Sequence, residues 1–374
     1  MMRYMTAGES HGEALVLIVD GFPSGLRADN KFINNELKRR MGGYGRGGRM
    51  SIERDSAHIL SGVRKGVTIG SPISMLIKNK DFSINKLPVV TKARPGHADL
   101  AGVLKYNEKD IRNVLERASA RETAARVAAG ALAKIFLAEF RIDITSHVTA
   151  IGDIEAETGE YTFEYIRSKA ERSDVRCVDK KSEKLMKNRI DSAMADNDTL
   201  GGVCEIIIKG CPPGLGSYAQ WDRRMDANLA RCLMSIPAVK GVEVGGGFAM
   251  ARLKGSYVHD EIVYSASGGF ERKTNNAGGL EGGVTNGENI VLKIAMKPIA
   301  TLRQPLDSVD IKSKKKVKAA VERADVTAVP SCGIIAEAVS SIEIANGMME
   351  KFGGDSMEEI TRNYRGYIEQ IRRF

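Results

Sequence analysis

The stretch SHGEALVLIVDGFPSGL at Ser10–Leu26 and the stretch TLGGVCEIIIKGCPPGL at Thr199–Leu215 each contain an apolar strand followed by G-x-P-x-G-L. Two further pairs follow in the same order: GVTIGSPISMLIK (Gly66–Lys78) with GVTNGENIVLKIA (Gly283–Ala295), and RAS (Arg117–Ser119) with RAD (Arg323–Asp325). Similarities that recur in one order along both halves indicate an internal duplication, in which loops absorb the changing spacing. We therefore expect a single domain, residues 1–374, made of two pseudo-repeats at roughly 1–195 and 196–374.

Hydrophobic periodicity outlines the elements of these repeats. Val- and Ile-rich runs predict strands at Ala14–Asp20, Val67–Ile77, Val203–Lys209, Val242–Leu253 and Ile290–Met296. Helical periodicity predicts helices at Asn30–Met41, Asp110–Phe140, Phe163–Ser173, Lys184–Asp196, Trp221–Ser235, Ile334–Lys351 and Ser356–Arg373. The second helix carries nine alanines between Arg117 and Phe140, which predicts a buried central helix with close neighbours. Strands and helices do not alternate regularly, so the expected fold class is α+β with antiparallel sheets.

Composition excludes several classes of protein. The chain has 374 residues, 43% of them hydrophobic, and 56 Lys+Arg against 47 Asp+Glu, a formal balance of +9. A chain with this apolar content is not predominantly disordered. The longest apolar run near the start, Ala14–Val19, is too short for a membrane span or a signal-peptide core, which predicts a cytoplasmic protein.

The five cysteines are scattered and form no C-x-x-C pair, so we expect small core residues and no metal site. The basic excess suggests an anionic partner, and composition alone leaves nucleic acid, a membrane surface and a phosphorylated small molecule open.

Three motifs could carry chemistry near the N-terminus. GESHG at Gly8–Gly12 matches the G-x-S-x-G of a nucleophile elbow, but a strand follows it where the elbow needs a helix. Ser10 is therefore not expected to be an acyl nucleophile. The Ser10–His11 pair on a glycine turn either meets a ligand or is a plain structural turn.

GYGRGG at Gly43–Gly48 contains G-x-G-x-x-G, but it follows a predicted helix and not a strand, so a dinucleotide site fails on context. Its arginines suit an oxyanion, because guanidinium groups bind phosphate or carboxylate bidentately and glycine lets the main chain approach. These arginines are Arg39, Arg40, Arg46 and Arg49. The alternative is a solvated basic loop.

ARPGHAD at Ala93–Asp99 places His97 after a Pro-Gly turn, with Asp99 as an expected helix N-cap. Histidine titrates near neutral pH, so a loop histidine can move a proton, although such residues are more often surface decoration. His58, His147 and His259 are interpreted as structural.

RASARET at Arg117–Thr123 puts Arg117 and Arg121 at i, i+4 on the long predicted helix, with Ser119 nearby. If that face is buried, two arginines need an anion between them; if it is exposed, they are ordinary solvated charges. KPIATLRQP and RADVTAVP add Lys297, Arg303, Arg323 and Asp325, and a carboxylate beside arginine stays ionised. The run Lys312–Lys318 is interpreted as a solvated loop.

Taken together, these motifs resemble the chorismate synthase family. The resemblance runs from Thr6 to at least Gly354 and rests on TAGESHG, the Arg40/Arg46 glycine loop, RPGHAD, RASARETAARVAAG, SIPAVKGVEVGGGF, NNAGGLEGGVTNG, KPIATL and RADVTAVP. One departure is ADNDTLGG (Ala195–Gly202), where Asn197 and Thr199 replace the Gly and Ser usual in the family. Because Thr keeps the hydroxyl, the departure affects turn geometry more than chemistry.

The resemblance implies a carbon–oxygen lyase of the shikimate pathway. It eliminates phosphate in a 1,4-anti sense from 5-enolpyruvylshikimate 3-phosphate to give chorismate, and uses reduced FMN without net redox change. The implied fold is a helical layer between antiparallel sheets, and the implied assembly is a homotetramer. No nucleic-acid or membrane partner is implied. The substrate has two carboxylates and a phosphate, for which the arginines are matching donors.

The resemblance also implies roles for individual residues. His11 would protonate the departing phosphate, His97 would protonate or hydrogen-bond the flavin, and Asp325 would assist proton removal, through a flavin nitrogen. The implied substrate-binding residues are Ser10, Arg40, Arg46, Arg49, Ser119 and Arg121. The implied FMN-binding residues are Arg117, Ala118, Ser119, Pro237, Ala238, Gly282, Lys297, Pro298, Ile299, Ala300, Thr301 and Arg323.

Two rival functions remain from the residues alone. A nucleic-acid-binding protein would need aromatic stacking platforms beside its basic residues, and the basic motifs contain only Tyr44. A flavin-dependent oxidoreductase would use the same cofactor for net redox chemistry. The sequence contains no recognisable nicotinamide domain, so we expect FMN to be reduced externally and not by this chain with NADPH.

Overall fold

A four-stranded antiparallel sheet opens the fold of this computed structural model, which describes residues 1–46, 55–157, 159, 161–266, 269–322 and 325–374. Its strand order is β1-β2-β6-β3, with β1 at Arg3–Ala7, β2 at Ala14–Asp20, β6 at Ile73–Lys78 and β3 at Ala57–Ile59. Leu15, Leu17 and Val19 alternate along β2 and are fully buried. This apolar face packs against a layer of helices.

A second antiparallel sheet has five strands in the order β10-β15-β9-β7-β8. These are Val239–Val244, Ile290–Met296, Gly202–Lys209, Asp143–Ile151 and Ile154–Glu155. Ile206, Ile207 and Ile208 in β9 are all buried, because helix α11 covers one face of this region while helices α6 (Phe163–Ala170) and α7 (Lys180–Ala195) pack on strands β7 and β8. The fold class is therefore mixed α+β with antiparallel sheets, as predicted.

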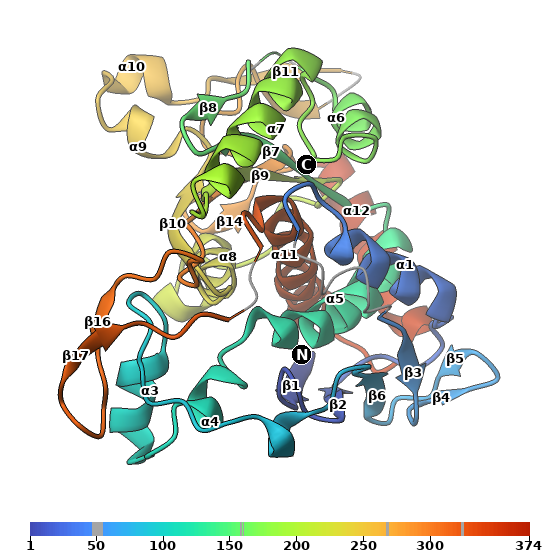
Figure 1. The fold of residues 1–374 in the computed structure, drawn as a ribbon. Coiled ribbons are helices and arrows are strands. Elements are labelled where there is room, and N and C mark those ends of the chain that lie inside the picture. The colour runs from blue at the N-terminus through green and yellow to red at the C-terminus, as the bar shows by residue number, and fades with distance from the viewer. Residues whose placement is uncertain (47–54, 158, 160, 267–268, 323–324) are drawn as a thin grey trace.

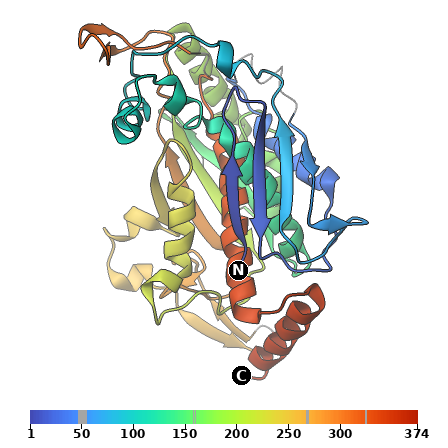
Figure 2. The ribbon, with the colours of Figure 1, turned by 90° about the horizontal axis from the view of Figure 1, so that it is seen from below.

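Helices fill the space between the two sheets (Figures 1 and 2). They are α1 (Asn30–Met41), α5 (Thr123–Ala138), α8 (Met225–Met234) and α11 (Val329–Phe352), with α12 (Met357–Arg372) beside the end of α11. Helices α5 and α11 cross closely, because a Cβ atom at Gly130 would lie only 2.5 Å from the Cα of Ala338. The predicted buried, alanine-rich central helix is confirmed for α5.

The two halves share hydrogen bonds that support the duplication. In the first half, the Thr68 hydroxyl donates to the Pro23 carbonyl at 2.7 Å and accepts from the Leu26 amide at 2.9 Å. In the second half, Thr285 makes the same pair of bonds with Pro212 and Leu215, at 2.7 and 2.8 Å. The strand order β1-β2-β6-β3 also matches β7-β9-β15-β10. We propose on these grounds that the domain arose by duplication.

A smaller unit beside the main body holds His97. It contains α3 (Asp99–Tyr106), α4 (Arg112–Leu115) and the hairpin of β16 (Asp307–Val309) and β17 (Lys316–Lys318). Its small core is formed by Val90, Ala93, Val103, Ile111 and Leu115. The lysine run, predicted as a loop, enters strand β17, and its lysines are exposed.

The remaining elements are short. They are β4 (Val63–Arg64), β5 (Val67–Thr68), η1 (Ile84–Lys86), η2 (Ala120–Glu122), η3 (Trp221–Arg223), α9 (Gly247–Met250), α10 (Gly255–Val258), β11 (Ile262–Ser265), β12 (Gly269–Arg272), β13 (Leu280–Glu281) and β14 (Val284–Thr285). In the described part of the chain, no helix is long and apolar enough to cross a membrane. All five cysteines are buried and free, which confirms them as core residues.

Several predicted elements were too long, and three of them show the reason. The strand predicted at Val67–Ile77 divides into β5 and β6, because Gly70 takes a positive φ of 77° and turns the chain. The strand predicted at Val242–Leu253 ends at Val244, before Gly245 with φ 57° and helix α9. The helix predicted at Asp110–Phe140 breaks at Ser119, whose ψ of 142° is extended. Strands β1 and β7 were not predicted.

Candidate active site

The GESHG motif forms the turn between β1 and β2, and a residue distant in sequence holds it in place. The carbonyl of Glu116 accepts the Ser10 amide at 3.0 Å, and its carboxylate accepts the His11 amide at 2.8 Å. Nδ1 of His11 lies 2.9 Å from the same carboxylate. The Ser119 hydroxyl donates to that of Ser10 at 3.2 Å. The Ser10–His11 pair is therefore joined to the segment that opens helix α5.

A buried carboxylate lies between two predicted substrate arginines. Asp55 accepts Nη1 of Arg121 at 2.6 Å and faces Nη1 of Arg40 at 3.5 Å. Arg40 lies in the last turn of α1, before Gly42 ends that helix, and also donates to Thr123 at 2.9 Å. Asn79 connects this group to the histidine turn, because its amide donates to the Gly12 carbonyl at 2.7 Å and accepts Nε of Arg121 at 2.9 Å.

The arginine group, which consists of Arg40, Arg46 and Arg121, has hydrogen-bond donors left for an external anion. Burial lowers the pKa of Arg40 to about 10, with Asp55 opposing the shift and the positive charges of Arg46 and Arg121 adding to it. The Asp55 carboxylate thus faces two guanidinium groups. Nη2 of Arg121 and Nε of Arg46 are buried and have no hydrogen-bond partner among the described residues. Buried donors without partners are costly, so this region favours an oxyanion ligand.

The glycine loop after α1 brings Arg46 to the second half of the chain. Nη1 of Arg46 lies 3.1 Å from the Asp325 carboxylate, and the Val326 amide donates to the Gly45 carbonyl at 2.9 Å. Gly45 needs its small size, because its φ is 82° and a Cβ atom there would lie 2.8 Å from Ile190. Burial lowers the pKa of Arg46, and Asp325 opposes this shift. The predicted residues Arg49 and Arg323 lie outside the described residues.

His97 has a carboxylate of its own. Its Nδ1 lies 2.5 Å from Oδ1 of Asp99, which also accepts from Arg94 at 2.9 Å. Burial alone would raise the pKa of Asp99, but hydrogen bonds from His97 and Arg94 outweigh it and hold the pKa well below its usual range. Asp99 was predicted as an N-cap and is instead the first residue of α3, so its side chain serves the histidine.

The KPIATL segment lies against the His97 loop. Nζ of Lys297 donates to the Gly96 carbonyl at 2.9 Å, and Nη1 of Arg94 donates to the Thr301 hydroxyl at 2.8 Å. The Lys297 amide donates to the Ala238 carbonyl at 2.9 Å, which joins the predicted Pro237–Ala238 turn to this segment. Burial lowers the pKa of Lys297, and the charge of Lys240 lowers it further. The structure therefore brings these predicted FMN-binding residues together.

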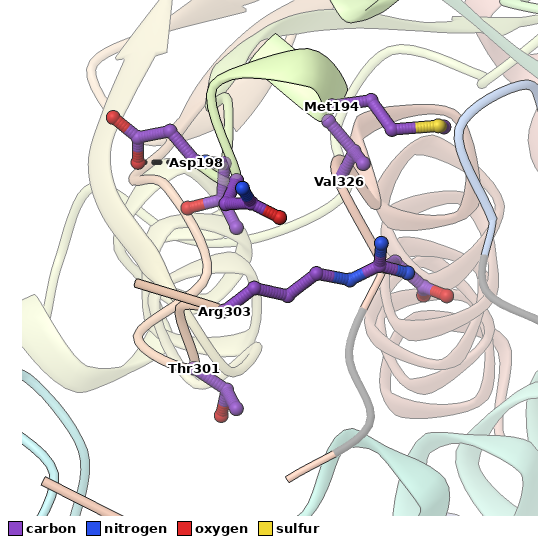
Figure 3. A pocket seen from close by; sticks show the side chains of 8 residues that line it. Met194, Asp198, Thr301, Arg303 and Val326 are labelled. Atoms are coloured by element: carbon purple, nitrogen blue, oxygen red, sulfur yellow. Dashed lines mark hydrogen bonds between the residues drawn. The ribbon is translucent and has the colours of Figure 1, made fainter. Parts of the chain in front are cut away.

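A small pocket joins the Asp325 and Thr301 regions. Figure 3 shows Arg303, Thr301, Asp198, Met194 and Val326 around it. Asn197, Thr199 and Asp325 complete the lining. Asn197 has a φ of 57°, which Asn tolerates better than most residues, so its replacement of Gly is explained. The Thr199 hydroxyl donates to the Ile299 carbonyl at 2.8 Å, which is the contact that the retained hydroxyl provides.

Some predicted placements were wrong. Arg117 and Arg121 do not share a helix face: the break at Ser119 sends Arg117 to β1, where it donates to the carbonyls of Thr6 and Gly8 at 2.8 and 3.0 Å. Arg121 forms an ion pair with the carboxylate of Asp55, so the anion that balances its charge is in part supplied by the protein and not by a ligand alone. Arg39 pairs with three carboxylates of the protein, Glu36, Glu171 and Glu337.

Gly282 is not joined to the other predicted FMN residues by any described contact, and a Cβ atom there would meet Tyr218 at 3.9 Å. Sequence reasoning missed Glu116, Asp55, Asn79 and Arg94 as members of the site. Of these, Arg94 lies inside the RPGHAD motif and Glu116 directly precedes RASARET, whereas nothing in the sequence around Asp55 or Asn79 marks them.

The site offers two imidazoles hydrogen-bonded to buried carboxylates and, near the His11 turn, arginines with unpartnered donors. These are the groups expected in the class of enzymes that use acid–base chemistry on a small polyanion. The family model for chorismate synthase matches residues 2–349. The chain belongs to the chorismate synthase family, whose members are lyases of the shikimate pathway.

Two chorismate synthases align with this chain over its whole length. The chain is 53% identical to the chorismate synthase of Geobacter sulfurreducens over 394 residues and 53% identical to that of Thermoanaerobacter pseudethanolicus over 376 residues, with 100% of each chain covered. A crystal structure of chorismate synthase matches with a TM-score of 0.83 at 42% identity, covering 100% of this chain and 99% of that one.

Proposed function

We propose that this chain converts 5-enolpyruvylshikimate 3-phosphate to chorismate by 1,4-anti elimination of phosphate, with reduced FMN as cofactor. The observation that carries the proposal is the continuous site that links His11, Arg121 and Asp55 through Asn79. A substrate with a phosphate and two carboxylates offers the acceptors that the unpartnered guanidinium donors need.

The arginine group, Ser10 and Ser119 would bind the substrate. Arg40, Arg46 and Arg121 supply positive charge in a buried region, where an ionic hydrogen bond is stronger than in water. Ser10, which precedes His11 in the chain, and Ser119, whose hydroxyl donates to that of Ser10 at 3.2 Å, would supply hydroxyl groups. Arg49 belongs to this proposal by its place in the glycine loop.

Three residues would donate or accept protons during the reaction. His11 would give a proton to the departing phosphate, since Nε2 of its ring has no partner among the described residues and is left for a ligand. His97 would protonate the flavin or donate a hydrogen bond to it, and its ring is oriented by Asp99. Asp325, held at 3.1 Å by Arg46, would assist proton removal from the substrate.

The proposed FMN residues suit an anionic, planar cofactor. Lys297 lies beside Gly96 and Ala238, and it would pair with the phosphate. Ala238 has a φ of 71°, a left-handed conformation that residues other than glycine seldom adopt. Pro237, Pro298, Ile299, Ala300, Thr301 and Arg323 would complete this wall, and the main chain of Arg117, Ala118 and Ser119 and the turn at Gly282 would contribute at its margins. When bound, reduced FMN supplies the electron density that C–O cleavage requires and recovers it afterwards.

We also propose a homotetramer in the cytoplasm. The hairpin β11–β12 exposes Ile262, Tyr264 and Phe270, with exposed fractions of 62%, 69% and 55%. Such an apolar patch on a hairpin favours contact with another copy of the chain. Sedimentation equilibrium of the purified chain tests the assembly, and a monomer at micromolar concentration would contradict it.

The reaction itself is tested without oxygen. The chain is mixed with the substrate and a small amount of chemically reduced FMN, and phosphate release is compared with flavin oxidation. Many phosphates released for each flavin, with the flavin still reduced, are expected for the lyase. One flavin oxidised for each phosphate would indicate an oxidoreductase and overturn the proposal. A parallel sample with oxidised FMN and NADPH tests the expectation that reduction is external.

A further inference from the structure

Glu116 holds the His11 turn at three points. Its carbonyl accepts the Ser10 amide at 3.0 Å, and Oε2 accepts the His11 amide at 2.8 Å. Nδ1 of the His11 ring lies 2.9 Å from Oε2 and 3.0 Å from Oε1. The main chain and the ring of His11 are thus oriented by one side chain from a different element, the end of α4.

The carboxylate of Glu116 is an obligatory acceptor. Its side chain is fully buried, and Nη1 of Arg112 lies 3.4 Å from Oε1. Burial alone would raise the pKa of Glu116, but hydrogen bonds from His11 and Arg112 outweigh it, so the pKa is lowered and the group is ionised. An ionised carboxylate has no proton to donate. Nδ1 of His11 must therefore carry the hydrogen in this contact.

We infer that Glu116 is a positioning residue that keeps a hydrogen on Nδ1 of His11 and thereby leaves Nε2 as the nitrogen that meets the substrate. In the proposed reaction the protonated ring gives up its Nε2 proton to the departing phosphate and returns to the Nδ1–H tautomer. The role given to Nε2 rests on the proposed function, whereas the tautomer does not. A buried carboxylate that orients an imidazole through Nδ1 has a large effect on turnover when the ring exchanges protons.

The other two histidine–carboxylate pairs, His97–Asp99 and His147–Glu205, differ from the His11–Glu116 pair in the contacts of the ring nitrogens. Nδ1 of His97 faces Asp99 at 2.5 Å but also Nη2 of Arg94 at 3.1 Å, so a donor and an acceptor compete for it. His147 uses Nε2 to meet Glu205 at 3.0 Å, across the paired strands β7 and β9. Only the His11 pair, among those in the described residues, places Nδ1 against a carboxylate with no competing donor at that nitrogen. Glu205 is therefore a matched control that lies outside the proposed site.

The experiment compares the full-length wild-type chain with Glu116→Gln and Glu205→Gln. Nitrogen-15 NMR of histidine-labelled protein reports the tautomer of His11, assigned with a His11→Ala variant. Anaerobic assays with reduced FMN report kcat and KM. In Glu116→Gln, we expect mixed His11 tautomers, a kcat lower by roughly 100-fold and a KM within about threefold of wild type. In Glu205→Gln, both the His11 signals and kcat should equal those of wild type.

The outcomes separate this inference from the proposed function. A wild-type His11 signal for the Nδ1–H tautomer that persists in Glu116→Gln overturns the inference, as does an unchanged kcat in that variant. If wild-type protein releases no phosphate but the tautomer changes in Glu116→Gln, the proposed function fails while the positioning role stands. If the Glu116→Gln chain does not fold, the wild-type spectrum decides: a His11 signal for the Nδ1–H tautomer supports the inference, and a signal for the Nε2–H tautomer overturns it.

Discussion

The guanidinium of Arg46 lies 3.1 Å from the carboxylate of Asp325, although the two residues belong to opposite halves of the chain. Their approach depends on Gly45, whose carbonyl accepts the Val326 amide at 2.9 Å. The proposed base is thus held beside a proposed substrate arginine by main-chain contacts.

Replacement of Asp325 by Asn preserves shape and removes the ability to take a proton. We expect kcat to fall by about 10²–10⁴-fold, the range for lost acid–base catalysis, with an unchanged circular-dichroism spectrum. Anaerobic phosphate release measures the effect. Asp143→Asn is the control, because Asp143 pairs with Arg167 on the surface and both side chains are about half exposed. Equal turnover in Asp325→Asn and Asp143→Asn would refute the role of Asp325.

The two histidines should each contribute to turnover. We expect His11→Ala and His97→Ala to lower turnover by roughly 10–1000-fold. Both rings are only about one-fifth exposed, and each meets a fully buried carboxylate, so a loss of stability has to be measured separately from a loss of turnover. Turnover and thermal unfolding are measured together. A variant with wild-type turnover would exclude that histidine from the chemistry.

Asp55 stabilises the arginine group when no ligand is present. In Asp55→Asn, two buried guanidinium groups lose their shared counter-charge, and we expect a loss of about 3 kcal/mol in the free energy of unfolding. Urea denaturation measures this loss, and the substrate should restore more stability to the variant than to wild type. Asp153→Asn, which removes an exposed partner of Arg189, should leave the urea midpoint unchanged. An unchanged midpoint in Asp55→Asn would show that the carboxylate does not balance the arginines.

Asp99 should make stability dependent on acid pH. Its folded-state pKa is held below the unfolded value of about 3.9, so its contribution is fully present above that value and is lost as pH falls through the folded-state pKa. We expect the unfolding free energy of Asp99→Asn to vary less with pH below about pH 4. Urea midpoints at several acid pH values measure the difference. Parallel curves for the two proteins would contradict it.

Gly130 should be needed for the α5–α11 crossing. A Cβ atom at this position would lie 2.5 Å from the main chain of Ala338, so we expect Gly130→Ala to destabilise the chain by about 1–3 kcal/mol. Gly366→Ala is the matched helical control, because a Cβ atom there meets nothing within 4 Å. It should instead stabilise α12 by up to about 1 kcal/mol. Equal effects in the two variants would show that the crossing tolerates a methyl group.

The elements themselves could largely be predicted from local sequence. Strands β2, β9 and β15 and helices α1 and α11 lie close to their predicted ranges, because apolar periodicity marks a face that must be buried. Errors occurred where a turn interrupts an apolar run. The extended backbone at Ser119, which divides the predicted Asp110–Phe140 helix, depends on contacts with the distant His11 turn and on the Ser119 hydroxyl that caps Arg121.

By itself, the sequence determined the two similar halves, the antiparallel α+β class, the family and the motifs that carry both histidines, since each depends on residue types at fixed short spacing. Only the tertiary structure decided which charged and polar side chains are paired with one another. Glu116 reaches His11, Asp55 joins Arg40 to Arg121, and Asn79 links the two groups. Such pairings depend on helices and strands that are far apart in the chain, and burial then makes each unpaired donor or acceptor costly enough to define the site.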